Sequence, residues 1–269
     1  MNALDKLKTV STATAATALF KRGFRSQCIQ NVHPLSPGQP VLVGPAFTLR
    51  YIPAREDLNK LDVFRDRSHP QRKAVEDCPP GAVMVMDSRK DARAASAGAI
   101  LVTRMMKRGV AGVVTDGGFR DSAEIAAMGI PAYHQRPSAP TNLTLHQAID
   151  INVPIGCGDA PVFPGDIILG DQDGVIVIPA NLLDEIADET FEMTAYEDFV
   201  TSRYAPARES SGSIPRPTRS RWSTSRPGER PTADSGRYFG HLHCNAALSQ
   251  RALSPADFWF WQFSDICRH

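Results

Sequence analysis

The sequence predicts an α/β fold, and two observations carry that prediction. Between Ala82 and Tyr133, short apolar runs of strand length alternate with amphipathic helix-forming segments. From Ile151 to Ile178, short apolar runs are instead separated by glycines and Pro-Gly-Asp turns, which indicates a β-rich closing segment. We therefore expect a single α/β domain over residues 1–200, followed by an irregular or disordered tail over residues 201–269.

The composition is that of a globular protein without a strong charge bias. Of the 269 residues, 42% are hydrophobic, which is enough for a substantial core, and the formal net charge is +1. That charge gives no reason to expect nucleic acid or an anionic membrane as a partner. The five cysteines have no zinc-type spacing, and no secretory signal or 18-residue apolar run is present. We expect a soluble cytoplasmic protein with reduced thiols.

The first part of the predicted domain contains a helix, a strand region and a charged segment. Ser11 to Lys21 is alanine-rich and predicts a helix, and Val41 to Tyr51 predicts one or two strands. Ile52 to Gln71 is mostly charged, and we interpret it as a surface loop with a short helix. His69 or Arg72 at its end remains an alternative candidate for bordering a pocket.

Repeated strand and helix segments form the centre of the chain, and a helix closes it. The predicted elements are strand Ala82–Met86, helix Ala92–Arg108, strand Val110–Val114, helix Ser122–Met128, strand Pro131–Tyr133 and the acidic helix Ala180–Val200. Two histidines, His134 and His146, lie beyond the last of these strands. We interpret both as structural, with a pocket position as the alternative for His134.

One motif stands out in this pattern, V-A-G-V-V-T-D-G-G-F-R-D from Val110 to Asp121. Its apolar start has the length of a buried strand, and we expect Gly117 and Gly118 to turn the backbone sharply after that strand. Arg120 and Asp121 would then be presented together beyond a strand end, which is where ligand sites tend to lie in α/β proteins.

Two interpretations of this pair remain open on spacing alone. In the first, Asp121 and Glu124 form a capping box for the next helix, and Arg120 is an exposed loop residue. In the second, the pair forms a site for a small anion and a metal. Arg120 would then bind a substrate carboxylate, and Asp121 would hold a hard divalent cation.

Two motifs together resemble those of a known family. Val113 to Asp121, with the small-residue helix before it, and P-G-D-I-I-L-G-D-Q-D-G-V-I-V-I-P from Pro164 to Pro179 resemble the RraA-like family. This family includes the regulator of ribonuclease activity A and 4-hydroxy-4-methyl-2-oxoglutarate aldolases. The resemblance covers about Ser11 to Val200. It implies an α/β fold with a swivelling β/β/α-like core, assembled as a ring-shaped homotrimer with sites between neighbouring subunits.

The same resemblance implies an activity and assigns roles to residues. In aldolase members, Mg²⁺ or Mn²⁺ binds the enol form of a pyruvate unit. Carried over, Arg120 matches the arginine that binds the pyruvate carboxylate, and Asp121 matches the metal-binding aspartate. The expected chemistry is retro-aldol cleavage of a 2-oxo acid or decarboxylation of oxaloacetate, releasing pyruvate. The backbone that would line the substrate is that of Gly98, Ala99, Ile100 and Leu101.

The chain departs from the family motif at one position. The family pattern is an acidic residue, twenty further residues, and then Arg-Asp, which places Ala99 at the acidic position. The carboxylate that would hold a metal-bound water is therefore missing, unless Asp87 or Asp91 substitutes for it. Ala99 favours an alternative function, that of a non-catalytic regulator that binds and inhibits a ribonuclease. Arg120 and Asp121 favour the lyase.

The tail departs from the family pattern as well. From about Arg203 the sequence is rich in Arg, Ser, Pro and Thr without periodicity, which is typical of a disordered tail. A shifted reading frame is the other interpretation. Codon sets exist for Ser213 to Glu229 whose overlapping frame encodes Y-P-A-T-D-P-E-S-L-V-D-F-A-A-W-R, a turn followed by an amphipathic helix. Phe258 to Phe263 would then be an accidental apolar patch and not a membrane anchor, with a partner-binding segment as the alternative.

The coding DNA distinguishes the two interpretations of the tail. If the frame has shifted, sequencing will find that peptide in the alternative frame opposite Ser213 to Glu229. A gene in which that frame encodes a different peptide would exclude the shift.

Overall fold

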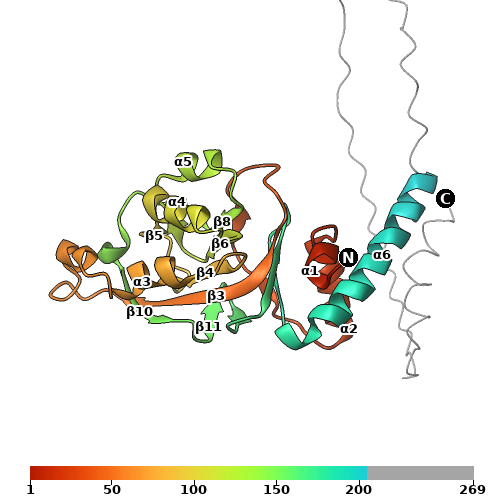
Figure 1. Ribbon diagram of the computed structural model, residues 1–269, viewed down its shortest axis with the longest axis horizontal. Coiled ribbons are helices and arrows are strands. Elements are labelled where there is room, and N and C mark those ends of the chain that lie inside the picture. Colours follow the sequence, from red (N-terminus) through yellow and green to blue (C-terminus); the bar gives the residue numbers. More distant parts are fainter. Residues whose placement is uncertain (205–269) are drawn as a thin grey trace, which may run out of the picture. The chain divides into compact units, whose positions relative to one another are not determined.

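A computed structural model describes residues 1–204, and the predicted tail beyond Tyr204, with both of its interpretations, lies outside the described residues. The longest strand, β3 (Leu42–Pro53), joins the two parts of a nine-stranded sheet (Figure 1). Its first residues pair antiparallel with β13 (Ile167–Gly170), and its centre pairs parallel with β4 (Val83–Asp87). Its last residues pair antiparallel with β10 (His146–Ile151).

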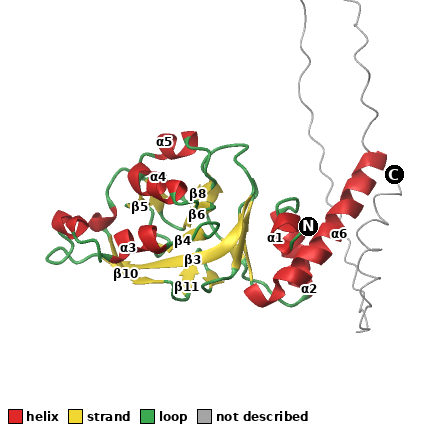
Figure 2. Cartoon of the chain, in the orientation of Figure 1, coloured by secondary structure: helices red, strands yellow, loops and turns green. Residues whose placement is uncertain are grey.

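The predicted alternation of strands and helices is confirmed. Strands β3, β4, β6 (Gly112–Thr115) and β8 (Ala132–His134) lie side by side and parallel. Helix α3 (Pro70–Asp77) lies in the connection from β3 to β4, α4 (Ala99–Lys107) in that from β4 to β6, and α5 (Ser122–Ala127) in that from β6 to β8 (Figure 2). Parallel strands need such crossover connections, so the sequence pattern and the topology agree.

A small second sheet was not predicted. The segment expected as the start of a helix at Ala92 instead forms strand β5 (Ala95–Ala97), and α4 begins only after Gly98. Strand β5 pairs with β7 (Gly118–Phe119), which pairs in turn with β9 (Arg136–Pro137). The predicted boundary of this helix was therefore wrong, because a three-residue strand of small residues has no periodicity that sets it apart from a helix.

The chain bends at Asp116 and Gly117, as expected after this strand, but the conformation of the two glycines differs from the expectation. Neither glycine has a positive φ, and Gly118 belongs to strand β7. A Cβ on Gly117 would lie 2.6 Å from Ser96 Oγ, and one on Gly118 would lie 2.7 Å from Ser138 Cβ. Besides the bend at Gly117, these glycines therefore allow close packing of the second sheet.

Further strands and helices lie before, between and after these elements along the chain. The strands are β1 (Cys28–Ile29), β2 (His33–Pro34), β11 (Ile155–Cys157), β12 (Ala160–Val162) and β14 (Val175–Ile178). The helices are α1 (Ala3–Leu7), α2 (Thr12–Lys21), η1 (Leu61–Arg65), η2 (Asn142–Thr144), η3 (Ala180–Leu182) and α6 (Leu183–Tyr204). No helix within residues 1–204 is long and apolar enough to cross a membrane.

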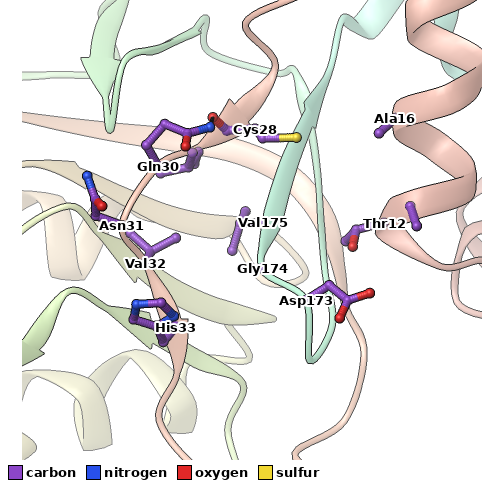
Figure 3. A pocket seen from close by; sticks show the side chains of 12 residues that line it. Thr12, Ala16, Cys28, Gln30, Asn31, Val32, His33, Asp173, Gly174 and Val175 are labelled. Carbon is purple, nitrogen blue, oxygen red and sulfur yellow. Dashed lines mark hydrogen bonds between the residues drawn. The ribbon is translucent and has the colours of Figure 1, made fainter. Parts of the chain in front are cut away.

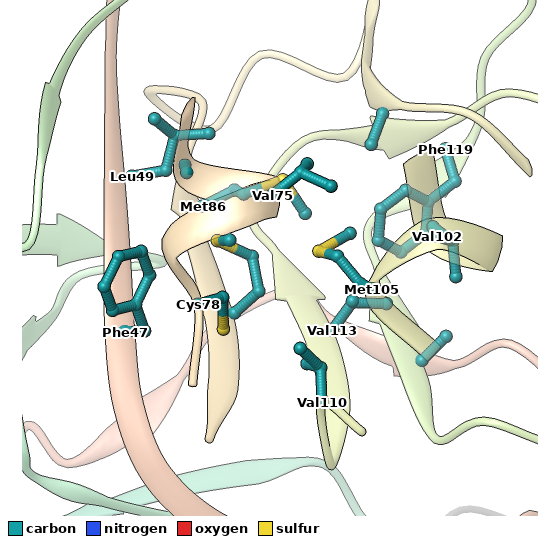
Figure 4. Close-up of a cluster of buried hydrophobic side chains, with 14 of the residues drawn as sticks. Phe47, Leu49, Val75, Cys78, Met86, Val102, Met105, Val110, Val113 and Phe119 are labelled. Atoms are coloured by element: carbon teal, nitrogen blue, oxygen red, sulfur yellow. The ribbon is translucent and has the colours of Figure 1, made fainter. Parts of the chain in front are cut away.

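The main hydrophobic core lies between the parallel strands and helices α3 to α5. Met105 of α4 packs there with Val113 of β6 and Phe119 of β7, and all three are buried (Figure 4). Burial of the apolar side chains that α3 and α4 turn toward the sheet therefore holds these helices in place. A separate apolar cluster joins α1, α2 and α6, where Lys21 pairs with Glu189 at 2.9 Å.

Asp116, at the end of β6, is fully buried and connects two loops. Its carboxylate accepts hydrogen bonds from the backbone N–H groups of Ser88 (2.6 Å), Lys90 (3.0 Å) and Gly158 (3.1 Å). Burial outweighs these bonds and, with the charge of nearby Asp87, raises the pKa of Asp116 to about 6. The folded state therefore favours the protonated carboxyl group.

This raised pKa predicts a pH dependence of stability. A carboxyl group with a folded pKa near 6 and an ordinary unfolded pKa contributes most to stability below both values. Its contribution is lost as pH rises toward 6, by on the order of 3 kcal/mol. Urea titrations of the native chain and of Asp116→Asn measure this contribution. We expect the difference between their free energies of unfolding, native minus variant, to fall by roughly 3 kcal/mol between pH 4 and pH 7. A difference that does not change with pH would contradict the assignment.

Candidate functional site

Arg120 and Asp121 follow strand β7 and lie against the start of α4. The Arg120 N–H donates to the carbonyl of Ala97 at 3.1 Å, so the end of β7 is fixed to the end of β5. Asp121 Oδ2 accepts from the Ala99 N–H at 3.3 Å and lies 3.4 Å from Arg120 Nε. Both side chains remain partly exposed, 47% for Arg120 and 37% for Asp121, so a ligand can reach them.

Gly98 makes this arrangement possible. A Cβ at this position would lie 2.7 Å from Arg120 Cγ and 2.9 Å from Asp121 Oδ2, closer than side chains pack. Gly98 also precedes α4 directly, and its carbonyl accepts from the N–H groups of Leu101 and Val102. Any side chain at position 98 would therefore displace Arg120 and Asp121, which pack directly against the Gly98 backbone.

The capping-box prediction was wrong. Asp121 is the residue before α5, but its side chain makes no capping bond there. Its backbone has φ 56° and ψ 35°, the left-handed conformation that aspartate tolerates better than most residues. Its carboxylate instead lies at the N-terminus of α4, where the Ala99 N–H and the helix dipole favour a negative charge.

The pair opens into a cleft of about 600 Å³, a size typical of small-molecule sites. Of the predicted substrate-lining residues, Gly98, Ile100 and Leu101 line this cleft with Arg120 and Asp121. The Ala99 side chain is buried behind the wall, and only its backbone N–H faces Asp121. The structure therefore brings this predicted set together.

Other cleft residues were not singled out as a site from the sequence. Arg72, left open as a pocket residue, lines the cleft, whereas His69 does not. The additional polar lining residues come from α3, α4 and the segment around η2: Gln71, Glu76, Arg104, Thr141 and Asn142. No motif joins them, because they come together only when these separate elements pack around β5.

Glu76 lies at the cleft as part of an ion-pair cluster. Its carboxylate accepts from Arg104 Nε at 2.9 Å and Arg104 Nη2 at 2.8 Å, and Arg108 Nη1 lies 3.3 Å away. The hydrogen bonds from Arg104 hold the pKa of Glu76 below its ordinary value. Glu76 is thus a paired anion rather than a free base.

Neither aspartate suggested as a substitute for the missing acidic residue lines the cleft. Asp87 accepts from the Arg89 N–H at 2.9 Å, and burial raises its pKa. Asp91 pairs with Arg93 at 2.7 Å, and this bond lowers its pKa to about 2. The position of Ala99 therefore has no replacement carboxylate from these two residues.

The donor set at the pair fits one kind of metal ion and not another. Within residues 1–204, no three His, Cys, Asp or Glu side chains are grouped so that they would hold an ion together. A tetrahedral zinc site is therefore not built here. Mg²⁺ is commonly held by one or two carboxylates and keeps several waters, so Asp121 in an open cleft fits a hydrated ion of this type.

The two histidines lie outside the cleft, in agreement with their structural interpretation. His134 stacks on Phe119 with ring centroids 5.7 Å apart, and burial lowers its pKa to about 4. His146 Nε2 lies 3.0 Å from the Asp91 carbonyl, and burial lowers its pKa as well. Both imidazoles are therefore held as neutral parts of the fold near pH 7.

A second, smaller pocket of about 310 Å³ lies between the start of α2, strand β1 and the turn before β14 (Figure 3). Cys28, His33 and Asp173 contribute to its wall. Burial raises the pKa of the Cys28 thiol, which disfavours the reactive thiolate. This pocket contains none of the predicted site residues.

Comparison with known proteins places the chain in a family. The sequence model of the RraA-like family, described as Aldolase/RraA, matches residues 10–177. The chain therefore belongs to the RraA-like family. Its fold agrees, since the crystal structure of Streptomyces coelicolor RraAS2 superposes with a TM-score of 0.66 at 28% identity, over 75% of this chain and 96% of that one. That protein is described as an unusual member of the RNase ES inhibitor RraA protein family.

Relatives with an enzyme name are also found. A Halalkalibacterium halodurans protein, provisionally named a 4-hydroxy-4-methyl-2-oxoglutarate aldolase, is 31% identical over 176 residues, 65% of this chain and 76% of the relative. A Thermus thermophilus protein named 4-hydroxy-4-methyl-2-oxoglutarate aldolase is 29% identical over 119 residues, 44% of this chain and 71% of the relative. The names of these relatives support an aldolase-type lyase.

The contact at Gly98 predicts a sharp effect of one methyl group. In Gly98→Ala, the new Cβ displaces Arg120 and Asp121, and a shift of about 1 Å can cost roughly a hundredfold in a site of this kind. We expect pyruvate affinity, measured by calorimetry with Mg²⁺, to fall at least tenfold while the melting temperature changes little. The matched control is Gly156→Ala, since no atom lies within 4 Å of a Cβ there. Equal pyruvate affinity in both variants would contradict the seating of the pair on Gly98.

Proposed function

We propose that the chain is a divalent-metal-dependent lyase that acts on a 2-oxo acid and releases pyruvate. One observation carries the proposal: a guanidinium and a carboxylate, Arg120 and Asp121, are held side by side on Gly98 at the wall of a cleft of about 600 Å³. The aldolase names of two relatives support the same reaction class. The substrates we propose are 4-hydroxy-4-methyl-2-oxoglutarate and similar 4-hydroxy-2-oxo acids, with oxaloacetate decarboxylation as a related activity.

Each residue of the pair has a separate role in this proposal. The Arg120 guanidinium binds the carboxylate next to the 2-oxo group, because its planar fork matches a carboxylate with two parallel hydrogen bonds. Asp121 would hold Mg²⁺ or Mn²⁺ through the oxygen that does not face the Ala99 N–H. When bound, such an ion withdraws electrons from the 2-oxo group and thereby favours cleavage of the adjacent C–C bond.

The weak point of this catalytic set is proton transfer. The residue at the family's acidic position is Ala99, and the nearby carboxylate of Glu76 is bonded to Arg104 and Arg108. A paired carboxylate with a lowered pKa is a poor general base near neutral pH. We therefore expect slow turnover, with substrate binding retained.

Pyruvate release tests the lyase. With Mg²⁺ and 4-hydroxy-4-methyl-2-oxoglutarate or oxaloacetate, Asp121→Asn and Arg120→Gln are each expected to lower kcat/KM by about a hundredfold or more, the scale for loss of an electrostatic catalytic group. The matched controls are Asp184→Asn and Arg67→Gln, which change exposed residues that do not line the cleft. Release by the native chain no faster than by Asp121→Asn would contradict the proposal.

A second function is favoured by a specific observation, the alanine at position 99. We propose as the alternative a non-catalytic regulator that binds and inhibits a ribonuclease, as the description of the Streptomyces structure states for its family. A surface interaction of this kind does not need the anion site. An endoribonuclease that co-purifies with the chain, and still does so with Arg120→Ala, would favour the regulator over the lyase.

The assembly belongs to the same proposal. Ile100 is 85% exposed on the first turn of α4, directly at the cleft. Burial of this side chain by a neighbouring subunit would remove its apolar surface from water. This position supports the ring-shaped homotrimer with sites between neighbours.

A further inference from the structure

We infer that Gln71 is a positioning residue of the candidate site. Its amide, together with the Tyr51 hydroxyl, fixes strand β5, and β5 in turn sets the place of Arg120 and Asp121. The inference rests on the proposed function, because it takes this pair to be the group that binds the 2-oxo acid. It goes further by assigning a role to two residues that no motif in the sequence singles out.

The backbone carbonyl of Ser96, the central residue of β5, accepts two hydrogen bonds from side chains of other elements. Gln71 Nε2 of α3 donates to it at 2.7 Å, and Tyr51 Oη of β3 donates to it at 2.9 Å. Gln71 Nε2 also donates to Tyr51 Oη at 3.0 Å, so the three groups bond to one another. Both side chains are buried, and hydrogen bonds are stronger where water is excluded. They therefore fix this carbonyl relative to both α3 and β3.

Strand β5 has little apolar packing of its own. It consists of Ala95, Ser96 and Ala97, and side chains of one methyl group bury little apolar surface. Within the described residues its only ladder partner is β7, and the register shifts there between Ala95 and Ala97. The position of β5 therefore depends strongly on the polar contacts of Ser96.

The position of β5 determines that of the charged pair, because Gly98 follows the strand directly. The Arg120 N–H donates to the carbonyl of Ala97, the residue after Ser96, at 3.1 Å. A Cβ on Gly98 would lie 2.7 Å from Arg120 Cγ and 2.9 Å from Asp121 Oδ2, so both side chains pack against this backbone. A displacement of the Ser96 carbonyl would therefore move Arg120 and Asp121 as well.

One atom of Gln71 indicates that the residue does more than stabilise the fold. Its Oε1 is buried and accepts no hydrogen bond within the described residues. A buried acceptor without a donor costs free energy, so the amide contributes less to stability than its two donated bonds alone would. A methionine would fill a similar volume without that cost. The amide differs from such a side chain in that it orients the Ser96 carbonyl.

Two substitutions separate positioning from contact with the ligand. Gln71→Met removes both donated bonds at a residue of the cleft wall, whereas Tyr51→Phe removes one bond at a residue that does not line the cleft. In calorimetry of the full chain with Mg²⁺, we expect pyruvate affinity to fall about tenfold in Gln71→Met and about threefold in Tyr51→Phe, less than the roughly hundredfold cost of a misplacement of about 1 Å. Because both bonds act on one carbonyl, the double variant should lose less than the product of the single effects.

A third substitution gives a readout that a loss of stability does not produce. In Gln71→Glu, the protonated carboxyl group donates to the Ser96 carbonyl, whereas the ionised group repels it. Burial raises the pKa of a carboxyl group at such a position. Relative to the native chain at the same pH, we expect Gln71→Glu to retain most of its pyruvate affinity at pH 5 and to lose about tenfold by pH 8.

The matched control is Thr48→Val, which also removes a buried β3 hydroxyl that donates to a backbone carbonyl, that of Val153 at 2.5 Å. Thr48 does not line the cleft, so this variant should leave pyruvate affinity unchanged. Native affinity in Gln71→Met, a loss of the same size in Thr48→Val, or a loss in Gln71→Glu that does not vary with pH would each overturn the inference. A native chain that does not bind pyruvate would overturn it as well.

Pyruvate release from a 4-hydroxy-2-oxo acid tests the proposed function separately. Release by the native chain would support the lyase even where the affinities of the variants overturn the role of Gln71. The expected affinities without any release would support the role of Gln71 and contradict the lyase.

Discussion

The close approach of two chain segments at Gly98 is the constraint on which the site depends. Because residue 98 has no side chain, Arg120 and Asp121 pack directly over the backbone between β5 and α4. Asp121 accepts there from the Ala99 N–H, and Arg120 is tied to β5 through the Ala97 carbonyl. The end of β5, the start of α4, Arg120 and Asp121 are thus in direct contact, so a change in one of them is expected to displace the others.

The small second sheet, β5–β7–β9, connects the segment around Gly98 to the main sheet. Buried hydroxyl groups join its first strand to the main sheet: Ser96 Oγ lies 2.7 Å from Ser88 Oγ and 2.6 Å from Thr115 Oγ1. Gly117 passes so close to these hydroxyls that a Cβ there would lie 2.6 Å from Ser96 Oγ. The end of β6 is fixed in turn by Asp116 and its three backbone donors. Fully satisfied polar networks of this kind favour one arrangement of a buried region.

The sequence predicted the main architecture because its signals are local. The parallel strands and their helices follow from apolar runs and periodicity, and V-V-T-D-G-G-F-R-D located the pair at a strand end. Sheet β5–β7–β9 was missed because strands of two or three residues have no measurable period. The capping box was predicted from the spacing of Asp121 and Glu124 alone. That spacing does not show that the Asp121 carboxylate accepts from the start of α4 instead of capping α5.

The rest of the cleft could not be predicted from local patterns. Arg72 and Asn142 are seventy residues apart, and they line the same cleft because α3 and η2 both lie beside β5. The Ala99 departure, in contrast, was visible from the spacing of the family motif, and the structure adds that Asp87 and Asp91 do not line the cleft. The family is shown by the match over residues 10–177, and the reaction and the metal remain proposals.

The central claim is that Arg120 and Asp121 hold a 2-oxo acid and a metal ion together. A crystal structure of the full chain grown with Mn²⁺ and oxalate, a dianion that resembles the enolate of pyruvate, tests it most directly. The account predicts an anomalous manganese peak at bonding distance from Asp121, about 2 Å from its carboxylate as for other small hard cations, with the oxalate on Arg120. Manganese bound elsewhere, or oxalate that does not contact Arg120, would contradict it.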